Sequence, residues 1–513
     1  MFTQVRSAST FGVDAYMIDV ETNIDSTVPR FHLVGLPDNA IKESYQRVFA
    51  AIRNSGFTFP RQRITVNLAP ADIKKEGSAF DLPIAIAILA GSAQMESESL
   101  SEFVVLGELA LDGSLRPIHG ALVVALEARQ QRARGLLLPH ANAREAALVE
   151  GLNVYPVDSL RDAVDFFSTS DDSRHPLRVK ASEVFGEEQS YELDFSDVKG
   201  QENVKRSLEV AAAGGHNLIM IGPPGSGKTM LAKRLPGILP PLVFEEAIET
   251  TKIHSVAGLL PAGKALVSQR PFRSPHHTIS DSALVGGGTI PRPGEISLAH
   301  HGVLFLDELP EFARNTLEVL RQPLEDSKVT ISRAKMSVDY PANFMLVCAM
   351  NPCHCGNFGN PGQDCTCHPA QIQKYVGKIS GPLLDRIDIH VEVPAVHYGE
   401  LAARKPGESS ASIRTRVLSA RKVQAIRFSG KEGLFSNADM SAKEIKEFCT
   451  IDRSGSELLK TAMNRLGLSA RAYDRILKVS RTIADLSGAE SIGVEHLGEA
   501  IQYRSLDRSF YAA

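Results

Sequence analysis

Residues 222–229 read GPPGSGKT and carry the residue types that bind nucleotide phosphates. They fit the pattern G-x-x-x-x-G-K-[ST], follow an apolar run at 217–221 and precede a helical pattern at 228–235. Glycines let backbone N–H groups approach phosphate oxygens, and a helix N-terminus adds a favourable dipole. We expect the lysine to bridge the β- and γ-phosphates and the threonine to bind Mg²⁺, which predicts a site for ATP with magnesium. The predicted nucleotide-binding residues here are Gly222, Pro223, Pro224, Gly225, Ser226, Gly227, Lys228 and Thr229.

Two adjacent acids, Asp307 and Glu308, end a second apolar run, VLFL. A strand that ends beside the phosphate loop would place Asp307 to bind Mg²⁺ together with Thr229, and Glu308 to polarise the attacking water. A third apolar run leads to Asn351, whose amide can orient the same water. The alternative for Asn351 is a turn residue before Pro352. Combined with the phosphate loop, the two acids predict hydrolysis of ATP rather than binding alone.

Four of the six cysteines lie in two short clusters, CHC and CTCH, which flank a polar loop rich in glycine and asparagine. Four thiolates from two such clusters can close a tetrahedron around Zn²⁺, and the metal would fix a loop too polar to pack a core. The alternative is a set of reduced cysteines in an exposed loop, and His354 or His368 could each replace one thiolate. Cys348, within an apolar run, is expected in the core. The predicted zinc ligands are Cys353, Cys355, Cys365 and Cys367.

Four regions of the chain would position these residues, and together they predict the α/β class. In 1–167, short β-type runs alternate with alanine-rich helical segments, which predicts one mixed α/β domain. Residues 168–192 are polar and predict a linker. Residues 193–394 alternate apolar strands with glycine-rich turns and helices, as a parallel sheet covered on both faces requires. Helical periodicity dominates 395–513, which predicts a helical C-terminal domain.

The composition excludes several classes of protein. In 513 residues, 56 Lys and Arg against 60 Asp and Glu leave a net charge of −4, so any contact with a polyanion must be local. The longest apolar stretches, such as 82–90, are far shorter than the ~20 residues that span a bilayer, so we expect no membrane segment. Residues 1–19 lack the apolar block of a secretory signal. These features predict a cytoplasmic protein.

The order of the motifs resembles that of AAA+ ATPases. The phosphate loop, the adjacent acids and Asn351 lie between DFSDVKGQ at 194–201 and GPLLDRID at 381–388. An unusually long segment precedes the acids, with RPFRSPHHT at 270–278 and RPGEIS at 292–297. This segment looks like the helix-2 insert of magnesium-chelatase motor subunits. The resemblance implies a central AAA+ parallel-sheet core and a C-terminal helical lid.

The same resemblance implies roles for three further side chains. Asn351 would be the sensor-1 residue, and Arg386 would be the arginine finger that reaches the γ-phosphate of a neighbouring subunit. Arg471, in the sequence LSAR, would be the sensor-2 residue of the lid. A finger acting on a neighbour implies a ring, usually a homo-hexamer. The alternative for each arginine is an ordinary surface or ion-paired side chain. The implied catalytic residues are Glu308, Asn351, Arg386 and Arg471.

The region 1–167 resembles the proteolytic domain of Lon-type proteases, a fold similar to domain 2 of ribosomal protein S5. The clearest stretches are GELALDG at 107–113 and PIHG at 117–120. Active members need a serine activated by a lysine. Here the serine position falls nearest Ala79, and no lysine follows PIHG. We therefore expect a non-proteolytic module for assembly or binding, with Ser78, one residue earlier, as the alternative nucleophile.

Over essentially the whole chain, this combination of regions resembles the ComM (YifB) family of bacterial competence proteins. Members are taken to be hexameric DNA helicases that drive branch migration during recombination of incoming DNA. The resemblance therefore implies single-stranded or branched DNA as the partner. Two alternatives remain open: a chelatase-type motor that drives metal insertion into a tetrapyrrole, and a regulatory ATPase that does not translocate.

Residues 328–338 predict a β-hairpin, because two alternating apolar runs flank a short basic turn. In ring motors such a hairpin resembles the pre-sensor element that projects into the central pore. Copies of Arg333 and Lys335 from every subunit would then line a channel that follows a phosphate backbone without reading bases. The alternative is a solvated basic turn, with Arg270 and Arg273 as the next candidates for DNA contact.

Overall fold

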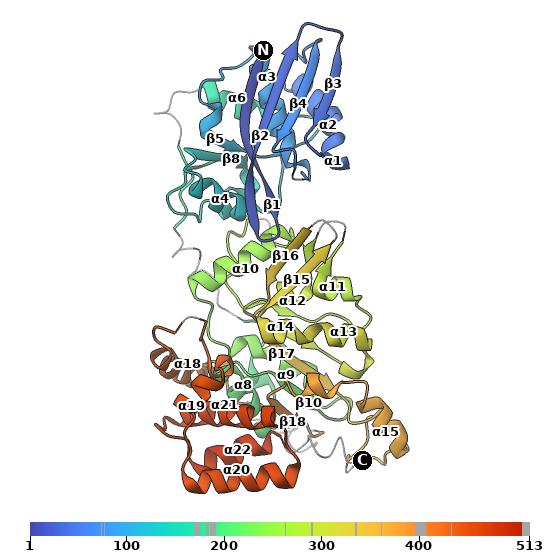
Figure 1. Ribbon diagram of the computed structural model, residues 1–513, viewed down its shortest axis with the longest axis vertical. Helices are drawn as coiled ribbons and strands as arrows, with labels where there is room; N and C mark the ends of the chain where they lie inside the picture. Colours follow the sequence, from blue (N-terminus) through green and yellow to red (C-terminus); the bar gives the residue numbers. More distant parts are fainter. Residues whose placement is uncertain are drawn as a thin grey trace. The chain divides into compact units, whose positions relative to one another are not determined.

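The computed structural model describes residues 1–72, 74–75, 77–168, 175–180, 184, 191–261, 263–288, 291–333, 336–360, 362–395, 407–431 and 433–504. The chain forms two compact units (Figure 1). Unit 1 comprises Met1–Glu188 and Val243–Ser268, and unit 2 comprises Gln189–Leu242 and Gln269–Ala513. The backbone therefore passes between the units three times. Most of the predicted linker, 168–192, lies outside the described residues.

Unit 1 is built on a seven-stranded sheet in the order β3-β4-β2-β1-β5-β8-β9. The long strands β1 and β2 are antiparallel, whereas β5, β8 and β9 run parallel to one another. The strands of unit 1 are β1 (Phe2–Phe11), β2 (Asp14–Asp25), β3 (Arg30–Val34), β4 (Arg63–Ala69), β5 (Phe103–Val105), β8 (Gly135–Pro139) and β9 (Val154–Val157), with the short pair β6 (Glu108–Leu109) and β7 (Leu115–Arg116).

Helices cover both faces of this sheet. Because successive strand residues point to opposite sides, neighbouring residues of one strand join different cores. Along β5, Phe103 and Val105 join the core under α2, α3 and α6, while Val104 joins the core under α4 and α5. Every residue of α3 is buried, which explains its almost uninterrupted apolar sequence. The helices of unit 1 are α1 (Asn39–Lys42), α2 (Ser44–Asn54), α3 (Asp81–Gly91), α4 (Ala121–Gln130), α5 (His140–Ala146), α6 (Leu160–Ser168) and α10 (Phe244–Val256).

Helix α10 belongs to unit 1, although its residues lie within the range 193–394 expected for the ATPase core. It packs on α4, and the backbone N–H of Gly120 donates to the carbonyl oxygen of Ser255 at 3.1 Å. The Ser255 hydroxyl also donates to the buried carboxylate of Glu145, whose pKa is raised by burial. These buried polar contacts attach the helix to the N-terminal domain, which sequence spacing alone does not indicate.

Unit 2 contains a five-stranded parallel sheet in the order β11-β14-β17-β10-β18. The first strand along the chain, β10, lies between the last two, β17 and β18. The strand order therefore reverses at β10, and ligands of open α/β sheets bind at the carboxyl edge beside such a reversal. The strands are β10 (Leu218–Ile221), β11 (Phe272–Arg273), β14 (Val303–Leu306), β17 (Met345–Met350) and β18 (Ile389–Glu392).

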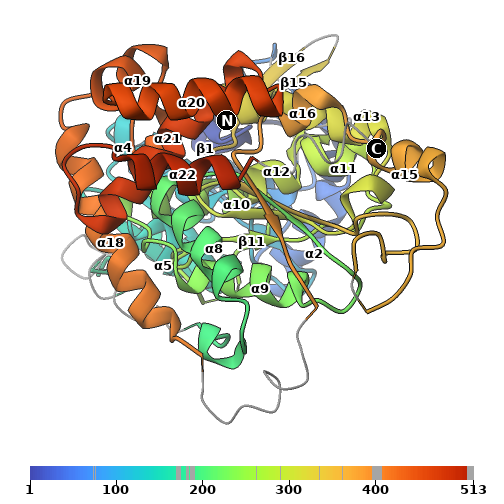
Figure 2. The ribbon, with the colours of Figure 1, turned by 90° about the horizontal axis from the view of Figure 1, so that it is seen from below.

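The C-terminal helices share one apolar core with this sheet. Figure 2 shows α20, α21 and α22 lying together, and α21 also contacts α8 and α18. Serine caps the start of α21, where Ser469 accepts from the backbone N–H of Ala472, and Gly488 ends the helix in the left-handed region. The helices are α8 (Glu202–Gly214), α18 (Ser410–Arg427), α19 (Ala442–Phe448), α20 (Arg453–Leu466), α21 (Ala470–Ser487) and α22 (Val494–Gln502).

Between the strands of unit 2 lie two small hairpins and several short helices. The predicted hairpin forms, with β15 (Lys328–Arg333) antiparallel to β16 (Met336–Pro341). The second pairs β12 (Gly286–Gly287) with β13 (Arg292–Pro293). The short helices are α9 (Lys228–Arg234), α11 (Asp281–Val285), α12 (Glu295–Leu298), α13 (Arg314–Glu318), α14 (Pro323–Asp326), α15 (Pro369–Val376) and α16 (Gly381–Leu384).

The predicted α/β class, the parallel-sheet core and the helical C-terminal region are confirmed. In the described part of the chain, no helix is both long and apolar enough to cross a membrane.

Candidate nucleotide site and cysteine cluster

The phosphate loop connects β10 to α9 at the carboxyl edge of the sheet. Two of its glycines are required by geometry. A Cβ atom on Gly222 would lie 2.1 Å from the carbonyl oxygen of Val393, which leaves no room for a side chain. Gly227, which immediately precedes α9, has φ of +88°, a conformation that favours glycine. Both positions therefore require glycine.

Lys228 is buried at the base of this loop, with 8% of its surface exposed. Its Nζ donates to the carbonyl oxygens of Gly222 at 2.8 Å and Pro223 at 2.9 Å, and to Oδ1 of Asn351 at 3.2 Å. Burial lowers the pKa of Lys228, and the nearby carboxylates of Asp307 and Glu308 oppose this shift. The lysine is therefore held in place by backbone acceptors that a phosphate oxygen could replace.

The acids at the end of β14 meet the phosphate loop as expected from their place in the sheet. The hydroxyl of Thr229 donates to Oδ2 of Asp307 at 2.6 Å. Oδ1 of Asp307 accepts from the backbone N–H of Glu308 at 2.9 Å. A hydroxyl and a carboxylate oxygen at this distance can share one Mg²⁺. Glu308 has φ of +53°, so the chain turns sharply at this residue and its side chain remains largely exposed.

His277 contacts the second acid, and the sequence had given this histidine no role. Its Nδ1 lies 3.2 Å from Oε2 of Glu308. The contact arises because β11 pairs in parallel with β14, so the residues that follow β11 lie beside the acids that follow β14. The only signal for this contact in the sequence is the pair of histidines that follows the short strand β11. This signal can be interpreted only when the strand order is known.

Gln201, in the DFSDVKGQ motif, also reaches the phosphate loop. It precedes α8 with φ of +57°, and its Nε2 donates to the carbonyl oxygen of Ser226 at 2.8 Å. The same amide donates to the carbonyl oxygen of Pro394 at 3.3 Å. Its Oε1 is buried without a hydrogen-bond partner among the described residues. This acceptor beside the loop was not identified from sequence.

Arg386 and Arg471 lie apart from the phosphate loop of their own chain. Arg386 is 4% exposed, pairs with Glu325 and donates to the carbonyl oxygen of Pro382 at 2.6 Å. Arg471 is exposed at the second residue of α21. Across the described ranges, neither guanidinium makes a hydrogen bond or ion pair with residues 222–229. Their predicted roles remain predictions.

A different lid arginine, Arg475, connects α21 to the sheet. It pairs with Asp388, which also accepts from the backbone N–H of Asn217 at 3.0 Å. Burial favours the protonated acid, but Arg475 and His216 overcome this effect and lower the pKa of Asp388 well below its usual range. The carboxylate of Asp388 therefore stays ionised and joins the lid to the amino ends of β10 and β18, at the edge of the sheet opposite the phosphate loop.

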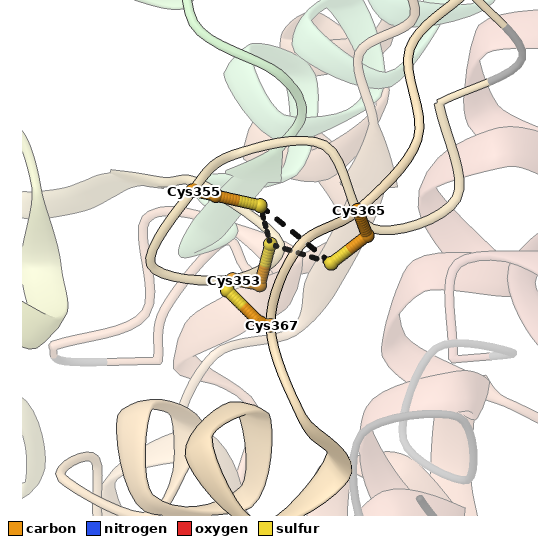
Figure 3. Close-up of side chains that lie close together, drawn as sticks. All are labelled: Cys353, Cys355, Cys365 and Cys367. Carbon is orange, nitrogen blue, oxygen red and sulfur yellow. Dashed lines mark hydrogen bonds between the residues drawn. The ribbon is translucent and has the colours of Figure 1, made fainter.

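The four clustered cysteines converge, as Figure 3 shows. Sγ of Cys353 lies 3.3 Å from Sγ of Cys355 and 3.6 Å from Sγ of Cys365, and the latter two are 3.6 Å apart. All four sulfur atoms lie within 4.8 Å of one another. Four ligands around Zn²⁺, with Zn–S of about 2.3 Å, would be separated by about 3.8 Å, so the residues fit a tetrahedral zinc site.

Hydrogen bonding already favours a thiolate in this cluster. The backbone N–H groups of Asn357 and Thr366 lower the pKa of Cys355 to about 5. Cys365 behaves differently: the backbone N–H of Cys367 opposes the shift, but burial and hydrogen bonds to the other sulfur atoms raise its pKa to about 12. The sulfur of Cys355 thus accepts hydrogen bonds, while the thiol of Cys365 keeps its proton and donates one. A metal ion would replace the protons that the sulfur atoms share.

The predicted DNA-binding residues are only partly described. Arg333 ends β15, but its side chain and the whole of Lys335 lie outside the described residues. Arg270 and Arg273, the alternative candidates for DNA contact, instead bind acceptors within the protein. Arg270 donates to the carbonyl oxygens of Pro240 and His301 at 2.5 and 2.7 Å, and Arg273 pairs with Glu295 at 2.6 Å.

The N-terminal domain places Ala79 in the short helical turn Ser78–Phe80. The Ser78 hydroxyl donates to the carboxylate of Glu108, so its described partner is an acid and not a lysine. The PIHG stretch lies against the residues that follow α10, because a Cβ on Gly258 would lie 2.4 Å from the His119 ring. That this domain is non-proteolytic remains a prediction.

A phosphate loop at the reversal point of a five-stranded parallel sheet, followed by a helical C-terminal region, defines an AAA+ protein of the magnesium-chelatase type. The family model "Magnesium chelatase, subunit ChlI" matches residues 194–401. The model "Subunit ChlI of Mg-chelatase" matches 20–142, and "Magnesium chelatase, subunit ChlI C-terminal" matches 407–504.

Curated relatives match almost the full chain. "Competence protein ComM" of Haemophilus influenzae is 46% identical over 505 residues, which are 98% of this chain and 97% of that protein. "Uncharacterized protein YifB" of Escherichia coli is 45% identical over 506 residues, with the same coverage of 98% and 97%. "Lon protease 2" of Bacillus subtilis is 34% identical over 157 residues, 28% of this chain and 27% of that protein. The chain belongs to the ComM (YifB) family of magnesium-chelatase-like proteins.

Proposed function

We propose that the protein is an ATP-hydrolysing motor that assembles as a homo-hexameric ring and acts on single-stranded or branched DNA. The observation that carries this proposal is the convergence at the phosphate loop. Lys228 contacts Asn351 at 3.2 Å, and Thr229 contacts Asp307 at 2.6 Å, although these residues come from distant parts of the chain. Three motifs predicted separately from sequence thus meet at one edge of the sheet.

Each residue of this site has a proposed role. The loop backbone and Lys228 bind the phosphates, while Thr229 and Asp307 hold Mg²⁺, which when bound neutralises charge on the phosphates. Glu308 polarises the attacking water, and Asn351 orients it. The exposed carboxylate of Glu308 and its contact with His277 support this assignment, because a base must reach the solvent that enters the site.

We propose a ring because, among the described residues, neither Arg386 nor Arg471 contacts the phosphate loop of its own chain. Arg386 would act on the γ-phosphate of the adjacent subunit, and Arg471 would act from the lid. Arg386 then has to leave Glu325 when the ring assembles. The finger position in GPLLDRID supports the proposal through the family resemblance.

A role on DNA is proposed from the similarity of the chain to a competence protein of Haemophilus influenzae. Branch migration during recombination or natural transformation is the proposed process. The hairpin β15–β16 is the proposed contact, through Arg333, which ends β15, and Lys335, which precedes β16 in the sequence; we call these two residues the tip of the hairpin. Its base is fixed by the hydroxyl of Tyr340, which donates to the carbonyl oxygen of Pro291 at 2.7 Å. A fixed base with a basic tip suits an element that grips a phosphate backbone.

We also assign Zn²⁺ to the four-cysteine cluster, on the sulfur separations of 3.3 to 3.6 Å. Protein purified without chelator should contain about one zinc per chain, as one tetrahedral site requires. Replacement of both Cys353 and Cys365 by serine should release it. Cys348→Ser is the control, because that buried cysteine lies in β17 and outside the cluster. Metal analysis by mass spectrometry decides between these outcomes.

The experiment that tests the motor is ATP turnover by the full chain with and without forked DNA. We expect forked or single-stranded DNA to increase turnover and the protein to displace a paired strand. The family models favour one other candidate, a chelatase-type motor that drives metal insertion into a tetrapyrrole. That candidate predicts turnover indifferent to DNA and a change in tetrapyrrole absorbance with a partner subunit.

A further inference from the structure

The cysteine cluster touches the phosphate loop directly. Gly356 follows Cys355 and has φ of +84°. A Cβ atom at Gly356 would lie 2.4 Å from Cδ and 2.7 Å from Cγ of Pro224. The backbone beside two of the four sulfur ligands is therefore packed against the loop that would hold the phosphates.

A second connection runs through Asn351, two residues before Cys353. The side chain of Asn351 accepts from Lys228 at 3.2 Å, so its position affects the lysine of the phosphate loop. Burial raises the pKa of Tyr375, on α15, and the nearby backbone of Asn351 opposes this shift, so the two residues lie close together. The Tyr375 ring also lies 6.2 Å from the ring of His354, between the first two cysteines.

Helix α15 connects the cysteine cluster to Tyr375. It begins at Pro369, two residues after Cys367, and its amino end is capped by His368. Asn351 is therefore connected along the chain to the first sulfur pair, which contacts the second pair across the cluster. The second pair is connected through α15 to Tyr375, which lies close to Asn351. A metal ion bound by both pairs would join them with four strong bonds.

We propose that occupancy of the cysteine cluster by Zn²⁺ controls the nucleotide site, because the metal holds Gly356 against Pro224 and Asn351 beside Lys228. This inference rests on the proposed ATP and zinc sites and adds regulation to them. Without the metal, the polar loop between the sulfur pairs has no apolar core of its own, so the phosphate loop and Asn351 lose one supporting wall. Small displacements at such positions are costly to binding and turnover.

The first test removes the metal from the full chain. Zinc is stripped with a chelator, the chelator is removed, and excess Mg²⁺ is restored before the affinity for a fluorescent ATP analogue is measured. We expect affinity to fall by about tenfold or more, and added zinc to restore it. Circular dichroism checks that the stripped chain stays folded. Equal affinity with and without zinc in a folded chain would overturn the inference.

The second test keeps all four cysteines and alters only the contact. Gly356→Ala places a methyl group against Pro224, whereas Gly359→Ala is a matched control. Gly359 lies in the same loop with φ of +76°, close to the +84° of Gly356, but a Cβ there would meet nothing within 4 Å. We expect both variants to retain zinc and only Gly356→Ala to lose nucleotide affinity.

The outcomes separate this inference from the function it rests on. Nucleotide binding by the zinc-loaded, unmodified chain tests the ATP site alone, and its absence would contradict the proposed function. If the unmodified chain binds nucleotide but the two glycine variants behave alike, the coupling between cluster and phosphate loop is wrong while the ATP site stands.

Discussion

Lys228 and Glu308 contribute to different steps of the proposed reaction, so their replacement should separate nucleotide binding from hydrolysis. Lys228→Ala removes the ammonium group buried beside the phosphate loop and should abolish tight binding. Glu308→Gln should still bind ATP but hydrolyse it about 100-fold more slowly or worse, since an amide cannot act as the base. Analogue binding and phosphate release measure the two steps. Normal turnover in Glu308→Gln would remove Glu308 from its role.

His277 should position Glu308 without binding nucleotide itself, given the 3.2 Å contact between the two side chains. We expect His277→Ala to lower kcat by about tenfold and leave nucleotide affinity unchanged, because only the orientation of the base is lost. His276→Ala is the control, since Nδ1 of His276 contacts the hydroxyl of Thr278 and not the acid. Equal effects of the two changes would indicate a general disturbance of the segment after β11.

At the scale of elements, the hairpin β15–β16 separates a structural base from the proposed DNA-binding tip. Arg333→Ala combined with Lys335→Ala should weaken DNA binding and remove its stimulation of turnover, while basal hydrolysis survives. The slope of affinity against salt should decrease by about 1 for each lost phosphate contact. Binding of a labelled single strand at several salt concentrations measures both effects.

The same hairpin supplies the control. Lys328 carries an identical charge at the base of β15, where its Nζ pairs with Asp339 at 2.8 Å. Lys328→Ala removes one positive charge from the hairpin but none from its tip, so DNA affinity should change little. If Lys328→Ala and the tip variant weaken DNA binding equally, then general charge rather than the tip is responsible.

At the scale of the whole molecule, the proposed ring makes a prediction that no single chain can satisfy. Arg386→Ala should bind ATP yet hydrolyse it poorly, because the γ-phosphate of the neighbour loses its arginine. Mixed with Lys228→Ala, which cannot bind ATP, it should regain part of its turnover at hybrid interfaces. Phosphate release measured over a series of mixing ratios tests this. The absence of recovery at every ratio would place the action of Arg386 within one subunit.

The pairing of Arg386 with Glu325 gives a second measurement on the ring. Glu325→Gln weakens the ion pair that holds the arginine in its own chain, so it should ease transfer to the neighbour and not reduce turnover. A loss of folding stability in Glu325→Gln, with turnover per folded chain preserved, would still agree with the ring. A loss of turnover equal to that of Arg386→Ala would make the ion pair itself the functional unit.

By itself, the sequence determined the parts of the protein that depend on short spacing. The phosphate loop at 222–229, the acids after VLFL and the hairpin over 328–338 could be predicted because neighbouring residues in one strand, turn or helix are fixed relative to one another by local geometry. The four cysteines fall in the same class, since two pairs separated by one short loop have few ways to fold without meeting.

Only the tertiary structure decided which distant elements meet. His277 reaches Glu308, and Gln201 reaches Ser226, because the sheet places β11 beside β14 and α8 beside the phosphate loop. Helix α10 lies within unit 1, where the backbone N–H of Gly120 donates to the carbonyl oxygen of Ser255, although its residues fall within the range 193–394. All three cases have one physical reason. Burial of apolar surface over the whole unit determines strand order and helix packing, and the spacing of residues along the sequence does not indicate which of them this packing brings together.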